Sequence, residues 1–111
     1  MNIVWFAFKG EEICFTHILL NALDAHRQGH EARIVIEGEA VRLVEPLQKN
    51  EHPLFAKALN AGLIDGICRA CSAKLGVLDY NASCGIALLE DMSGHPSMEP
   101  YLRQGFQVIT L

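Results

Sequence analysis

Basic residues are scarce and scattered in this chain, which argues against a surface built to bind nucleic acid. Nine Lys and Arg residues stand against thirteen Asp and Glu residues, giving a formal net charge of -4 over 111 residues. No stretch is rich in Lys or Arg, whereas proteins that bind a phosphate backbone concentrate such residues. We therefore expect no nucleic-acid partner.

Long hydrophobic runs are also missing. The apolar run at residues 3–8 is too short to span a membrane, and no basic residues precede it as they would in a signal peptide. We therefore expect a cytoplasmic protein with no membrane partner. Structural disulfides are rare in that compartment, so metal binding and reactive thiols compete to explain the four cysteines: Cys14, Cys68, Cys71 and Cys84.

A phosphate-binding glycine loop is absent as well. Such a loop would follow the first strand, where this chain has Lys9 and Gly10 and then the acids Glu11 and Glu12. Carboxylates at the start of a helix repel the anion that the helix end would otherwise bind. We therefore expect neither a nucleotide nor a flavin, and no other cofactor.

The sequence does contain a regular alternation of strand-like and helix-like segments. Half of its residues are hydrophobic and a fifth are charged, which is typical of a folded chain, here a single domain over residues 1–111. The expected strands are residues 3–8, 33–36, 64–68, 86–89 and 106–110. The expected helices are residues 11–28, 40–44, 53–62, 72–75 and 97–103, with 79–84 a short helix or a loop and a polar loop between Pro46 and Pro53.

Strands that alternate with helices pair in parallel through right-handed crossovers, and the helices then cover the sheet. The predicted fold class is therefore α/β, with three α/β/α layers, helices on both faces and a mainly parallel sheet of about five strands.

Cys68 is the residue most favoured to carry chemistry. It ends the third expected strand and stands directly before a helix, which Gly76 can end in a left-handed conformation. The unpaired N–H groups at the start of that helix favour the thiolate, which is the nucleophilic form of cysteine. The competing interpretation is a buried apolar residue, since free cysteine is often buried.

Three parts of the chain together resemble the DsrE-like family, which includes the DsrE/DsrF sulfur-oxidation proteins and the TusD-type sulfur relay subunits. They are the long helix after the first strand, residues 65–77 (DGICRACSAKLGV) and residues 105–109 (GFQVI). The resemblance implies a five-stranded parallel sheet, a trimer or hexamer, and partner proteins that donate and accept sulfur. It also implies a persulfide-carrying cysteine after the third strand, a position that Cys68 matches.

Cys71 is an additional cysteine relative to many members of that family, and the loop between residues 38 and 53 looks short. Three roles remain open for Cys71: a resolving thiol, a metal ligand or a packing residue. Cys14 and His17 share one helix face and could add two metal ligands, although a core cysteine and a rim histidine are their ordinary explanation in an amphipathic helix. We therefore assign no metal site from the sequence.

Two further residues are candidate neighbours of Cys68. His95 follows the fourth expected strand, so it belongs to the same edge of a parallel sheet and could deprotonate a thiol. Arg69 could favour a thiolate by its charge, and both residues could equally be ordinary surface groups. Cys84 is interpreted as buried.

The first functional hypothesis is a cytoplasmic sulfur-handling protein that carries persulfide sulfur on Cys68, with Cys71 as the resolving thiol. Such a protein is a carrier or sulfurtransferase rather than an enzyme with its own small-molecule turnover. The alternative is an oligomeric binding module, with or without a metal, whose cysteines are structural and transfer no sulfur.

Overall fold

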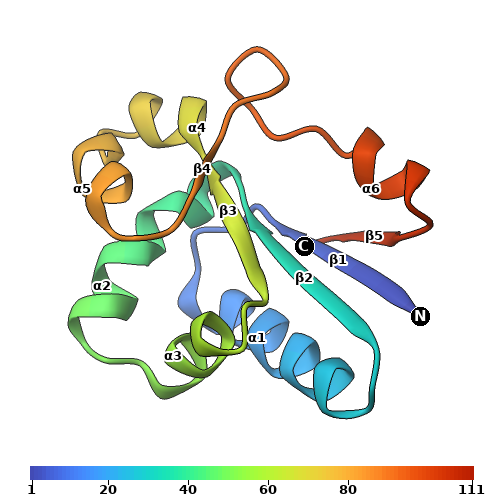
Figure 1. Cartoon of the computed structure of the whole chain (residues 1–111). Coiled ribbons are helices and arrows are strands. Elements are labelled where there is room, and N and C mark those ends of the chain that lie inside the picture. The colour runs from blue at the N-terminus through green and yellow to red at the C-terminus, as the bar shows by residue number, and fades with distance from the viewer.

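The computed structural model describes residues 1–111 and confirms the α/β fold: five strands form one sheet in the order β4-β3-β2-β1-β5, and every neighbouring pair is parallel (Figure 1). The strands are β1 (Asn2–Ala7), β2 (Glu31–Ile36), β3 (Ile64–Cys68), β4 (Leu88–Leu89) and β5 (Gln107–Thr110). The helices are α1 (Glu12–Arg27), α2 (Val44–Lys49), α3 (Pro53–Asn60), α4 (Arg69–Lys74), α5 (Leu78–Ser83) and α6 (Glu99–Arg103), with a 3₁₀ helix η1 over Gly38–Leu43.

The central strands are apolar because both of their faces are covered. Val4 and Phe6 of β1 are fully buried, as are Ile34, Val35 and Ile36 of β2. A strand that alternated apolar and polar residues would put polar groups into one of these two layers, so a continuous apolar run is typical of a parallel sheet.

The two faces of the sheet are covered very unequally. The larger core of twenty buried residues draws on α1, α2, α3 and η1, and residues of α4 and α5 pack against it. The smaller core on the other face consists of Val4, Phe6, Val35 and Phe106, packed against Tyr101 of α6 among others. Figure 1 shows α6 beside β5 and apart from α1, α2 and α3.

Right-handed crossovers explain this asymmetry. From β1 to β4 the chain advances across the sheet in one direction, so each right-handed connection places its helix on the same face. The last connection reverses direction to bring β5 beside β1, and the same handedness then places α6 on the opposite face. Helices thus lie on both faces, as expected, but the second face has a single helix of five residues.

Some local expectations were wrong. The predicted polar loop between Pro46 and Pro53 is helix α2 in its first half, up to Lys49, because a proline in the first turn of a helix loses no intrahelical hydrogen bond. Residues 50–52 form the connection to α3 as a loop. The helix expected at residues 72–75 begins at Arg69, because Cys68 already caps it. The strand expected at residues 86–89 forms only over Leu88–Leu89, and residues 79–84 are mostly helix α5.

No helix of the structure is both long enough and apolar enough to cross a membrane. The radius of gyration, 12.9 Å, is close to the value of about 13 Å expected for a folded chain of this length.

Gly66 allows β4 to approach β3 closely. A Cβ atom at this position would lie 2.5 Å from Leu89 Cγ and 2.8 Å from the Ala87 carbonyl oxygen. The Ala87 oxygen is itself fixed, since it accepts a hydrogen bond of 2.8 Å from the Ile67 N–H. The short strand β4 can therefore pair with β3 only where a residue without a side chain leaves room.

We expect Gly66→Ala to destabilise the fold by about 1–3 kcal/mol, because the added methyl group would push β4 away from β3. Urea denaturation followed by circular dichroism measures the change. Ala56→Ser, an exposed position on α3, is the control and should stay within about 0.5 kcal/mol of the wild type. A Gly66→Ala effect no larger than that of the control would contradict the expectation.

Candidate functional site

Three strands deliver chemically active side chains to one edge of the sheet. Glu37 directly follows β2, Cys68 is the last residue of β3, and His95 belongs to the loop after β4. Because β2, β3 and β4 are parallel neighbours, their carboxyl ends meet at the same edge. This is the edge at which ligands bind in open α/β sheets.

At this edge, four side chains converge to form what we call the Cys–His–Glu cluster: Glu37, Cys68, Cys71 and His95. The Cys68 Sγ atom lies 3.2 Å from His95 Nδ1, and the Cys71 Sγ atom lies 3.7 Å from the same nitrogen. Glu37 Oε1 lies 3.1 Å from Cys71 Sγ and 3.6 Å from His95 Nδ1. All four donor atoms lie within 4.8 Å of one another.

The start of α4 brings the two cysteines to the same side. Cys68 is the N-cap of this helix, and its Sγ atom accepts a hydrogen bond of 3.4 Å from the Cys71 N–H. Residues three apart on a helix lie on the same face, so the Cys71 side chain lies on the same side as that of Cys68.

A buried hydrogen-bond network holds α4 in place beneath the cluster. The Ser72 hydroxyl donates to the Cys68 carbonyl oxygen at 2.8 Å. The Asn81 side-chain amide of α5 then donates to the Ser72 hydroxyl and to the Val41 carbonyl oxygen, each at 3.0 Å. Because Ser72 and Asn81 are both fully buried, this network fixes the position of Cys68 relative to η1 and α5.

His95 is positioned by a tight turn. Ser93 and Gly94 both have positive φ, and Met92 and His95 exchange backbone hydrogen bonds of 2.7 and 2.9 Å across them. The Gly94 carbonyl oxygen accepts a bond of 2.8 Å from the N–H of Ala70, which anchors the turn on the first residues of α4. A two-residue turn with positive φ at both positions favours glycine at the second, as found here.

Glu37 is positioned by the glycine that follows it. Gly38 has φ +53°, and a Cβ atom there would come within 2.9 Å of the Phe8 carbonyl oxygen. Its N–H donates to Glu37 Oε1 at 3.1 Å. Glu37 and Gly38 together thus hold the Glu37 carboxylate at the carboxyl edge of the sheet, where this side chain is only 8% exposed.

Access to the cluster is uneven. Cys68 is fully buried, whereas Cys71 is half-buried and the His95 side chain is 41% exposed. Cys71 and His95 line a surface hollow of about 530 Å³ together with Phe8 and Met92 among other residues. A reactant arriving from solvent therefore meets Cys71 and His95 first.

Both thiols hold their protons more tightly than a free cysteine does. Burial raises the pKa of Cys68 well above its usual range, and a hydrogen bond to Glu37 raises it further. The pKa of Cys71 is raised by the same two causes in the same order. The Cys71 N–H lowers the pKa of Cys68, but the expectation that the helix start favours a thiolate was wrong for this state, because burial outweighs one N–H donor.

The other candidate residues lie outside the cluster. Cys14 and His17 line a separate hollow of about 530 Å³ near Leu111. Arg69 pairs with Glu90 at 3.9 Å.

Cys84 is half-buried rather than buried, and its thiol donates to the Asn81 carbonyl oxygen at 3.3 Å.

Sequence reasoning missed Glu37, although the rule that singled out Cys68 and His95 applies to it equally. It is the first residue after an apolar strand, so it too reaches the carboxyl edge.

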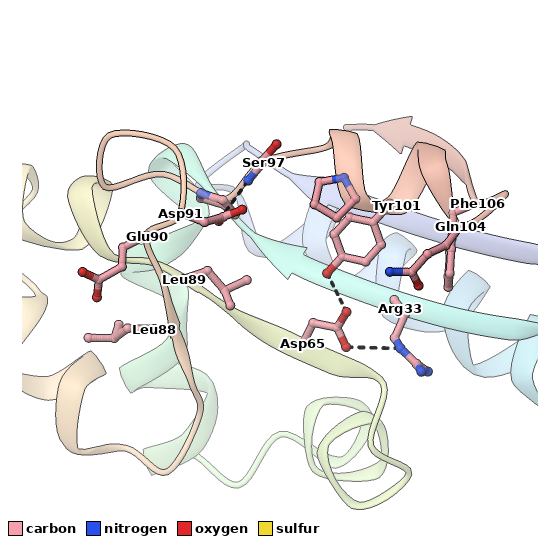
Figure 2. Close-up of a pocket in the computed structure, with 12 residues that line it drawn as sticks. Arg33, Asp65, Leu88, Leu89, Glu90, Asp91, Ser97, Tyr101, Gln104 and Phe106 are labelled. Atoms are coloured by element: carbon pink, nitrogen blue, oxygen red, sulfur yellow. Dashed lines mark hydrogen bonds and ion pairs between the residues drawn. The ribbon is translucent and has the colours of Figure 1, made fainter.

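A third hollow, of about 620 Å³, lies on the thinly covered face, between α6 and strands β2, β3 and β4 (Figure 2). Tyr101 of α6 donates a hydrogen bond of 2.6 Å to Asp65, which also pairs with Arg33 at 3.3 Å. The Tyr101 ring packs edge-on against Phe6 and Phe106. These polar groups satisfy one another, so we interpret them as the anchor that holds α6 on the sheet.

We expect Glu37→Gln to speed the alkylation of Cys71 by iodoacetamide at pH 8 by about threefold or more, because the neutral amide lowers the raised pKa of the thiol and increases its thiolate fraction. In the wild type the rate should still be rising above pH 9, since the raised pKa of Cys71 lies beyond the ordinary value of 9.0. Peptide mass spectrometry measures the rate. Glu39→Gln, an exposed carboxylate beside Glu37 in the chain, is the control, and an unchanged rate in Glu37→Gln would contradict the assignment.

Comparison with known proteins gives one relative. No family model matches the chain, and no solved structure matches it. The chain is 33% identical over 98 residues to the uncharacterized protein MJ0733 of Methanocaldococcus jannaschii, an alignment that covers 86% of this chain and 78% of that protein. At this identity and coverage, the chain belongs to the same family as MJ0733.

Proposed function

We propose that this is a cytoplasmic sulfur-handling protein of the DsrE-like type, which carries persulfide sulfur on Cys68 with Cys71 as its second thiol. The observation that carries the proposal is the convergence of both sulfur atoms on one imidazole nitrogen, at 3.2 and 3.7 Å. A thiol beside a general base is the arrangement that makes a cysteine nucleophilic. Two such thiols allow one cysteine to accept a sulfur atom and the other to hold it until it is transferred.

Sulfur acceptance begins at Cys71, because this half-buried thiol is more exposed than the fully buried Cys68. His95 takes the thiol proton, and the Cys71 thiolate attacks the terminal sulfur of a persulfide on a donor protein. A new S–S bond forms on Cys71, the donor S–S bond breaks, and the donor leaves as a thiolate that takes up the proton. One sulfane sulfur moves between two cysteines, with no net oxidation or reduction.

The same exchange then moves the sulfur inward. The Cys68 thiolate attacks the terminal sulfur on Cys71, so a persulfide forms on Cys68 and the Cys71 thiol is restored. Because Cys68 is fully buried, the sulfur held there is shielded from water and from unrelated thiols. Running the two exchanges backward delivers the sulfur to the thiol of an acceptor protein.

Cys71 also offers a second release route, as a resolving thiol. Its thiolate can attack the Cys68 sulfur of the persulfide, which releases hydrogen sulfide and forms a Cys68–Cys71 disulfide. The two sulfur atoms lie within 4.8 Å of each other, and an external dithiol must then reduce the disulfide to restore the cycle.

The partners in this proposal are a sulfur-donor protein, a sulfur-acceptor protein and further copies of this chain in a trimer or hexamer. Large apolar side chains at the surface support self-association: Ile13 is 68% exposed and Leu102 is 59% exposed. Exposed apolar groups of this size favour burial between copies of a small domain.

Incubating the reduced, metal-free protein with polysulfide should add one sulfur atom that dithiothreitol removes, as seen by intact-mass spectrometry. We expect Cys68→Ser to give only a short-lived adduct, because its sulfur cannot move inward from Cys71. We expect Cys71→Ser to slow adduct formation about tenfold, because the more exposed thiol is then missing from the exchange. Cys14→Ser and Cys84→Ser, outside the cluster, are the controls. An adduct in Cys68→Ser that lasts as long as that of the wild type would sink the proposal, and so would an adduct that only Cys14→Ser removes.

A further inference from the structure

We propose that the Cys–His–Glu cluster is also a binding site for one divalent ion of the zinc type, held by Glu37, Cys68, Cys71 and His95. This inference is independent of sulfur transfer, because it concerns the same side chains as ligands rather than as reactants. It would hold even if the protein carried no persulfide.

The spacing of the four donor atoms is close to that of a tetrahedral site. Zinc binds sulfur at about 2.3 Å and nitrogen or oxygen at about 2.0–2.1 Å, which places neighbouring ligand atoms about 3.3–3.8 Å apart. In the cluster, Sγ of Cys71 lies 3.1 Å from Glu37 Oε1 and 3.7 Å from His95 Nδ1. Cys68 Sγ lies 3.2 Å and Glu37 Oε1 lies 3.6 Å from His95 Nδ1, so the four separations are within about 0.2 Å of this range. The two remaining pairs, Cys68 with Cys71 and Cys68 with Glu37, lie within 4.8 Å.

The kinds of donor atom narrow the choice of ion. Two thiolates, an imidazole and a carboxylate form a ligand set that zinc takes, whereas magnesium and calcium prefer oxygen donors throughout. Because all four positions would be filled by protein side chains, the site is of the closed kind, which stores an ion or stabilises the fold rather than activating water.

The surrounding fold already holds these ligands in place. The N–H of Gly38 holds Oε1 of Glu37 at 3.1 Å, the cap of α4 holds the Cys68 sulfur, and the tight turn at Ser93 and Gly94 holds the histidine. The ligands come from three separate segments, yet an ion could bind without any backbone rearrangement. The exposed side of His95 and the hollow beside it give the ion a path from solvent.

The charge of the cluster is otherwise unbalanced. Glu37 is a nearly buried carboxylate whose only ion-pair partner is His95. Arg69, which directly follows Cys68, is engaged by Glu90. A buried carboxylate beside two thiols gains most from a cation that binds all of them together. A divalent ion supplies that cation.

Metal binding and sulfur carriage would exclude each other, because both use the sulfur lone pairs of Cys68 and Cys71. The metal-bound form would keep the thiols from oxidation and from stray persulfides. Removing the ion would return both of them to the exchange chemistry proposed above.

Titrating the reduced, chelator-treated protein with Co²⁺ tests the inference. We expect one Co²⁺ per chain, with the intense visible bands of a tetrahedral ion and a near-ultraviolet sulfur-to-cobalt band, and Zn²⁺ should displace it. His95→Ala and Glu37→Gln should each weaken Co²⁺ binding about tenfold or more, and Cys71→Ser about a hundredfold, since each removes one ligand. Zn²⁺ should also raise the melting temperature of the wild type but not of Cys71→Ser.

Cys14→Ser and His17→Ala remove the other cysteine–histidine pair and are the matched controls, which should bind Co²⁺ as the wild type does. Circular dichroism of each apoprotein shows whether the variant is folded. Absence of binding by the folded wild type would overturn the inference, as would the weak spectrum of an octahedral ion or undiminished binding by both His95→Ala and Cys71→Ser. The polysulfide experiment uses metal-free protein, so either proposal can fail while the other stands.

Discussion

The shared direction of β2, β3 and β4 is the constraint on which the rest of this structure depends. Parallel strands present all their carboxyl ends to one edge, so three segments far apart in the sequence each deliver a side chain there. The handedness of the crossovers then places five helices on one face and α6 alone on the other. The cluster and the uneven layers thus have a common origin in the topology of the sheet.

Within the cluster, the decisive interaction is between Glu37 and the two thiols. The carboxylate accepts a hydrogen bond from Cys71 and opposes ionisation of both cysteines, so the resting state favours protonated sulfur. His95 has the opposite effect, because an imidazole beside a thiol can take its proton. Reaction with a persulfide or binding of a metal ion would each shift this balance toward thiolate, one by covalent exchange and the other by coordination.

The sequence was sufficient to predict the parallel sheet, because short strand-like segments such as residues 3–8 and 64–68 alternate with helix-like segments along the chain. Cys68 and His95 were singled out by their place after a strand, but their contact distance depends on the turn at Ser93, which has no strong pattern of its own. Glu37 was missed because a single acid after a strand resembles any surface residue. Helix α2 was missed because Pro46 was taken as part of a loop instead of a first helical turn.

The tethering of His95 has a consequence of its own. Its loop leaves β4, a strand of two residues at an outer edge of the sheet, and is tied to α4 by the hydrogen bond from the Ala70 N–H to the Gly94 carbonyl oxygen. Glu37, Cys68 and Cys71 are attached instead to the well-packed interior of the sheet. Segments with so few pairing partners open at a small fraction of the free energy of global unfolding. Local opening of β4 would move the His95 imidazole away from the cluster and leave the two thiols in place. Any chemistry that needs both the imidazole and the thiols would therefore depend on this local equilibrium as well as on the stability of the core.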